Sequence, residues 1–187
     1  DRYWETFTSY PGSGSTGPNG GNVGGTPTSG NHYIGTEVSS QYNKTFILES
    51  DVLTDPVGSL SFYYHAYGAN IGVLKVDYST NGGTSWVTKS TIVNGSQTHT
   101  SRSDNWTQST INDFSSATNR IRFHYTSGSS YKGDCGLDDI VLVTSTGTIA
   151  WTTDASNGTS GWSATNTEDI TVTNNATTDH VGNYTIT

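Results

Sequence analysis

Two runs of alternating apolar and polar residues, the second followed by a glycine turn, constrain this chain to antiparallel β-structure. In GSLSFYYHAYG, residues 58–68, Leu60, Phe62 and Tyr64 alternate with more polar neighbours, as expected of a strand with one buried face. In VLKVDYS, residues 73–79, apolar and charged side chains alternate again, and Asn81-Gly82-Gly83 follows. Because asparagine and glycine tolerate positive φ angles, this turn predicts a β-hairpin.

Later segments extend the β pattern. RIRFHY, residues 120–125, alternates apolar and basic or histidine side chains, whereas DDIVLV, residues 138–143, is apolar on both faces after its carboxylates. The second pattern predicts a central strand covered on both sides. No segment shows helical spacing, so we expect an all-β fold, an antiparallel two-sheet jelly-roll sandwich with a C-terminal extension that carries strands.

Composition excludes several classes of protein. Eight basic and sixteen acidic residues give a net charge of −8, which argues against nucleic acid as a partner. No apolar stretch approaches the roughly 18 residues of a membrane helix, so no membrane insertion is expected. The one cysteine, Cys135, has no partner for a disulfide within the chain, and we expect it to be a small buried apolar side chain rather than a nucleophile.

The chain divides by composition into two parts. Residues 1–146 are expected to form the jelly-roll domain, with a long Gly/Ser/Thr loop at 9–31 that lacks regular structure. Residues 147–187 are rich in Thr and Asn and hold too few apolar residues for a core of their own. Their strand-like pieces need hydrogen-bond partners if they order. They either complete the fold, enter a neighbouring subunit, or begin another domain near Gly147.

Three blocks of sequence resemble the MAM domain, the module of meprins, neuropilins and receptor phosphatases. The blocks are FILESDVLTDP, GSLSFYYHAYGANIGVLKVDYSTNGGTSW and YTSGSSYKGDCGLDDIVLV, and the resemblance spans about residues 3–143. It implies a secreted or cell-surface, non-enzymatic module used in adhesion or oligomerisation. Its partners would be copies of itself, other cell-surface proteins or glycans. In its lack of disulfides the chain resembles the cysteine-poor bacterial members of the family.

The resemblance also implies an opening strand that this sequence lacks before Tyr3. The tail is weakly similar to that strand at Ile149 to Asp154 and at Gly161-Trp162. A sandwich short of one strand exposes an unpaired edge, and strand donation between subunits would build a filament. The residues expected in the donated strands are Ile149, Trp151, Trp162, Ile170 and Val172.

Carboxylates near the DDIVLV strand are candidate ligands of a structural Ca²⁺. Asp138 and Asp139 are neighbours in a strand and therefore point to opposite faces, so at least one is expected to be buried. Calcium prefers six to eight oxygen ligands, and Asp139 is the first candidate, followed by Asp138, Glu49 and Asp134. The alternative is an aspartate held by arginine or by backbone amides.

Other candidate sites are weaker. Tyr63, His65 and Tyr67 lie opposite the core face of their strand, and sugar binding on them is the alternative function. Neither a zinc motif, a GxSxG motif nor a facing pair of carboxylates is present, so no catalysis is expected. Asparagines in glycosylation sequons are candidates for modification if the protein is secreted by a glycosylating organism. They are Asn43, Asn94, Asn105, Asn157, Asn175 and Asn183.

Overall fold

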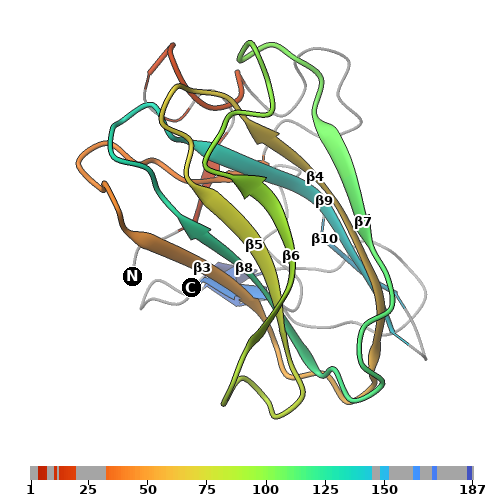
Figure 1. Ribbon diagram of the computed structural model, residues 1–187. Coiled ribbons are helices and arrows are strands. Elements are labelled where there is room, and N and C mark those ends of the chain that lie inside the picture. The colour runs from red at the N-terminus through yellow and green to blue at the C-terminus, as the bar shows by residue number, and fades with distance from the viewer. Residues whose placement is uncertain are drawn as a thin grey trace.

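A computed structural model shows two β-sheets that face one another (Figure 1). It describes residues 4–7, 11, 13–19, 33–144, 148–151, 162–164, 170–171 and 185–186, and the strands after residue 147 are described by their backbone pairing. Every strand pair is antiparallel. The all-β jelly-roll prediction is therefore confirmed. Within the described ranges, no helix is long and apolar enough to cross a membrane.

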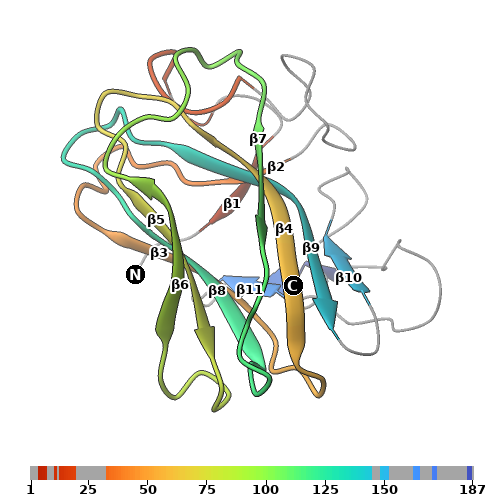
Figure 2. The same cartoon turned by 45° about the vertical axis from the view of Figure 1, so that its right-hand side comes forward.

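The larger sheet has six strands and is built around β9. One edge of β9 pairs with β4, while β2 and β10 share its other edge (Figure 2). β1 pairs with β2, and β7 pairs with β4. The strands are β1 (Glu5–Phe7), β2 (Tyr33–Gly35), β4 (Val57–Ala66), β7 (Thr107–Ile111), β9 (Cys135–Thr144) and β10 (Thr148–Trp151). The central position predicted for DDIVLV is confirmed, but the predicted cover on both faces is not complete, because Val141 is half-buried and Val143 is 37% exposed.

The smaller sheet has five strands in the order β11-β3-β8-β5-β6. Its two ends differ, because β6 comes from the middle of the chain and β11 from the C-terminal part. A separate pair joins β12 to β13. The strands are β3 (Thr45–Ser50), β5 (Val73–Ser79), β6 (Val87–Asn94), β8 (Arg120–Thr126), β11 (Trp162–Ala164), β12 (Ile170–Thr171) and β13 (Thr185–Ile186).

The core lies between the two sheets and follows the predicted alternation. Leu60 and Phe62 of β4 are fully buried, as are Ile121 and Phe123 of β8. The rings of Phe62 and Phe123 meet edge to face, with centroids 4.8 Å apart, a favoured geometry for aromatic pairs. Cys135 is also fully buried as a free thiol, as expected, and burial raises its pKa.

The predicted hairpin joins β5 to β6. Gly82 and Gly83 have φ angles of 68° and 95°, which residues with a Cβ rarely adopt. The side-chain oxygen of Asn81 accepts hydrogen bonds from the Ser79 hydroxyl and the Ser85 amide. Two register shifts interrupt the pairing of β6 with β5. Such bulges discourage other strands from pairing with the free edge of β6.

Parts of the N-terminal region pack on this framework. Trp4 lies in the core and is 2% exposed. Thr16 and Gly17, within the predicted loop 9–31, both donate hydrogen bonds to the Tyr67 carbonyl at the end of β4. This portion of the loop is therefore tied to the larger sheet. The predicted boundary at residue 146 stays a prediction.

Candidate functional site

The outer edge of β3 is where the C-terminal part of the chain joins the smaller sheet. β8 pairs with one edge of β3, and β11 pairs with the other through Trp162 with Ser50, Ser163 with Glu49, and Ala164 with Leu48. Every residue of β3 from position 46 to position 50 is buried. Burial on both faces is usual for a central strand, and β3 is a central strand of this sheet because β11 pairs with its outer edge.

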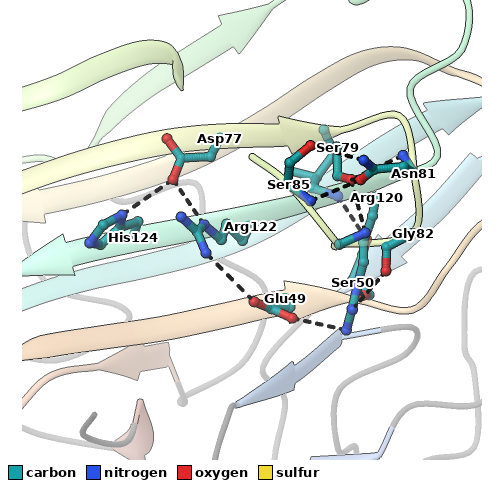
Figure 3. A network of polar contacts seen from close by, with 12 residues as sticks. Glu49, Ser50, Asp77, Ser79, Asn81, Gly82, Ser85, Arg120, Arg122 and His124 are labelled. Atoms are coloured by element: carbon teal, nitrogen blue, oxygen red, sulfur yellow. Dashed lines mark hydrogen bonds and ion pairs between the residues drawn. The ribbon is translucent and has the colours of Figure 1, made fainter. Parts of the chain in front are cut away.

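A row of charged side chains crosses the sheet beside this edge (Figure 3). A Glu49 oxygen lies 2.9 Å from Arg120 Nη2, and its other oxygen lies 4.0 Å from Arg122 Nη1. Glu49 is only 8% exposed. Because burial of an unpaired carboxylate is costly, the two arginines are what allow a glutamate at this position.

Asp77 continues the row on β5. Its carboxylate accepts hydrogen bonds from Arg122 Nε at 2.9 Å and from the Thr88 hydroxyl at 2.8 Å, and His124 Nδ1 lies at 3.2 Å. Burial alone would raise the pKa of Asp77, but the hydrogen bonds of His124, Thr88 and Arg122 outweigh it and lower the pKa to about 2. A carboxylate that stays ionised near neutral pH is a poor general acid.

Trp86, just after the hairpin turn, stacks on this row. The guanidinium carbon of Arg122 lies 4.4 Å from the ring centroid, and that of Arg120 lies 5.9 Å away. A tryptophan face attracts a cation and shields it from water. The sequence showed the alternation that places these side chains on one face, but not which carboxylate each arginine meets.

Arg120 also marks where the pairing between β3 and β11 stops. Its Nε donates a hydrogen bond to the Ser50 carbonyl at 2.8 Å, and Ser50 is the last residue of β3. The Ser50 hydroxyl in turn accepts a hydrogen bond from the Ile121 amide at 3.0 Å. These contacts hold the end of β3 in place. They thereby position the backbone groups with which a strand on the outer edge of β3 pairs.

The adjacent aspartates of β9 form a β-bulge. Ser61 pairs with Val141 and Tyr63 with Asp138. Two residues of β9, at positions 139 and 140, therefore lie opposite the single β4 residue at position 62. Asp139 adopts a φ of 46°, and its amide donates a hydrogen bond to Asp138 Oδ1. Asp138 is fully buried and Asp139 is half-buried. The buried member of the pair is thus Asp138, although Asp139 was the first candidate ligand.

The four carboxylates predicted as calcium ligands are held in different ways. Glu49 pairs with arginines in the smaller sheet, whereas Asp134 accepts a hydrogen bond from the Val38 amide at 2.9 Å. Burial raises the pKa of Asp134 to about 7. Across the described positions, no three His, Cys, Asp or Glu side chains are grouped so that they could hold a metal ion. Calcium binding stays a prediction.

His65, one of the three residues predicted as a sugar-binding surface, is buried in the structure. His65 is 0% exposed and stacks on His99, with centroids 4.0 Å apart, and Trp106 lies 5.7 Å away. Tyr63 and Tyr67 are half-buried. A sugar needs an exposed aromatic face, which His65 does not offer.

Sequence reasoning missed the part that His99 plays. Its Nδ1 accepts a hydrogen bond from the Ala66 amide at 3.1 Å, and its Nε2 lies 3.2 Å from the Thr107 hydroxyl. His99 must therefore be neutral to hold the end of β4, and burial lowers its pKa. Burial and the neighbouring His99 lower the pKa of His65 to about 3. No spacing motif marked this pair in the sequence.

The remaining candidates fall partly within the described residues. Asn43, Asn94 and Asn105 are exposed, as glycosylation requires. Of the predicted assembly residues, Ile149 and Trp151 lie in β10, Trp162 in β11 and Ile170 in β12. The described residues do not include Asn157, Asn175, Asn183 or Val172.

A comparison with protein families agrees with this architecture. The model of the MAM domain, meprin/A5/mu, matches residues 1–148, which is most of the 187-residue chain. The match ends at the start of β10, so β11 lies beyond it. MAM domains are extracellular, non-catalytic modules of the adhesion type. The chain therefore belongs to the MAM domain family.

Proposed function

We propose that this chain is a non-catalytic extracellular subunit that assembles with copies of itself through its C-terminal strands. The observation that carries the proposal is the pairing of β11 with β3. A strand beyond the MAM match covers a sheet edge that is buried like the interior of a sheet. An edge that accepts this strand from its own chain presents the same hydrogen-bonding groups to the same strand of a neighbour.

Strand pairing of this kind supplies a useful amount of free energy. Each net hydrogen bond of a ladder contributes about 0.5–1.5 kcal/mol, and apolar burial adds about 25 cal/mol per Å². Because a strand given by one copy and received by the next uses two different surfaces, the contact repeats head to tail. The expected product is an open chain of subunits.

The Asp77 carboxylate and the buried Cys135 thiol support a role without catalysis. Asp77 is held as an anion, and the pKa of Cys135 is raised by burial. Neither group is placed as an acid or a nucleophile near neutral pH.

Light scattering of the full chain over a range of concentrations tests the proposal, with negative-stain imaging of the same samples. Proline at a paired position removes an amide donor from a ladder, so Ser163→Pro is expected to lower the mean mass of the assemblies. Ser163→Thr keeps the amide and is the matched control. A wild-type chain that stays monomeric at every concentration would falsify the proposal.

A further inference from the structure

β10 and β11 are connected to the domain by very different lengths of chain. Residues 145–147 alone separate β9 from β10, and Thr148 pairs with Val143. A chain spans at most about 3.3–3.6 Å per residue. A connection of three residues is too short for β10 to pair with a strand other than the β9 that precedes it. β10 therefore belongs to its own subunit.

β11 is not restricted in this way. Ten residues, 152–161, lie between β10 and β11, which allows a reach of roughly 33–36 Å. Facing sheets are only about 10 Å apart. The same connection that lets β11 reach the smaller sheet of its own chain is therefore long enough to reach a neighbouring copy.

The acceptor edge differs from the other end of the same sheet. With β11 paired to it, β3 is buried from residue 46 to residue 50, and the Ser50 carbonyl at its end is held by Arg120. β6 is largely exposed, including Val87 at 54%, and carries two register shifts. A bulged, exposed strand resists further pairing. β3 is thus the edge of this sheet that is suited to accept a strand.

We infer that β11 is the strand exchanged between copies of this chain, that the outer edge of a neighbour's β3 is its acceptor, and that β10 stays in its own subunit. The inference rests on the proposed function and names the surfaces that it uses. The incoming strand pairs Ser163 with Glu49 of the next copy, in the register seen within one chain. β11 forms the same residue pairs with β3 of its own chain and with β3 of a neighbour. Because only the second arrangement joins two molecules, its share increases with protein concentration.

Mixing two single-cysteine chains tests the inference. Glu49→Cys and Ser163→Cys are made separately in a Cys135→Ala background, one chain is isotope-labelled, and the pair is mixed while dilute, concentrated and oxidised. Directly paired residues have Cβ atoms close enough for a disulfide to form with small adjustment. The expected result is a disulfide between a labelled and an unlabelled chain.

Val143→Cys and Thr148→Cys provide the matched control for β10. These positions also pair directly, so the double variant is expected to form a disulfide within one chain, whereas the mixed single variants form none between chains. Ser50→Cys with Trp162→Cys serves as a second β11 pair, because Glu49→Cys removes an ion pair. Thermal melting confirms that each variant folds.

The outcomes separate the inference from the proposed function. If scattering shows assemblies but neither mixed β11 pair links a labelled to an unlabelled chain, β11 is not exchanged and the inference is wrong, while self-assembly stands. A disulfide between chains in the β10 control would also overturn the division between the two strands. If scattering shows only monomers, the proposed function itself fails.

Discussion

Lowering the pH should change the stability of the fold through two buried groups that act in opposite directions. His65 has an ordinary pKa of 6.5 and a pKa of about 3 in the fold. Between these values the unfolded chain binds a proton that the folded chain excludes, so the contribution of His65 is complete above pH 6.5 and is lost towards pH 3. Each pH unit changes the free energy of unfolding by about 1.4 kcal/mol. At pH 5 the loss from His65 is about 2 kcal/mol.

Asp134 acts in the other direction. Its pKa rises from 3.8 to about 7 in the fold, so the folded chain takes up the proton first as the pH falls. Its contribution is therefore complete below pH 3.8 and is lost as the pH rises through 7. From pH 7 to pH 5 the gain is about 2 kcal/mol, because half of the folded chains already carry this proton at pH 7. Asp77 titrates below this range. His99, whose pKa is also lowered by burial, adds to the loss from His65, so in the wild-type chain the gain from Asp134 opposes the loss from the two histidines between pH 7.5 and pH 5.

Urea unfolding of three chains at pH 7.5 and pH 5.0, in the presence of a chelator, separates the two contributions. Relative to wild type, His65→Phe should gain about 2 kcal/mol on acidification, and Asp134→Asn should lose about 2–3 kcal/mol. Comparing the two pH values within each variant removes the effect of the substitution on packing. A His65→Phe chain that follows the wild-type pH dependence would refute the argument that buried, neutral His65 stabilises the fold.

Three further predictions concern single positions and the metal. Asp139→Gly should leave the melting temperature unchanged or raise it, whereas Asp139→Val should cost at least about 1–2 kcal/mol, because its φ of 46° disfavours a branched side chain; equal melting temperatures would contradict this. Phe123→Ala should destabilise the fold by about 3–5 kcal/mol in urea unfolding, and a cost below about 1 kcal/mol would show that Phe123 does not fill the core. If Ca²⁺ is bound, chelation lowers the melting temperature, and an unchanged midpoint argues against the ion.

Local patterns in the sequence predicted the parts of the fold that depend on local physics. Asn81-Gly82-Gly83 marked the β5–β6 hairpin because few residues adopt the φ angles that it requires. The apolar residues on both faces of the strand ending at Val143 identified it as central.

The remaining features depend on contacts that sequence alternation does not encode. Asp139 follows Asp138 as an ordinary strand residue would, so its positive φ and the resulting bulge left no signal. His65 is buried because His99 and Trp106, from a segment without periodicity, pack against it. The pairing of β11 with β3 joins segments more than a hundred residues apart, and its register depends on where the sheet ends.

Hydrogen exchange in β3 tests the central claim, that a C-terminal strand completes the smaller sheet, most directly. The outward amides of residues 48–50 should exchange slowly in the wild-type chain and in Ser163→Thr, because β11 covers them. In Ser163→Pro these amides should exchange at least about ten-fold faster, which corresponds to a loss of about 1.4 kcal/mol in protection, while those bonded to β8 keep their rates. Equal protection of the outward amides in all three chains would contradict the account.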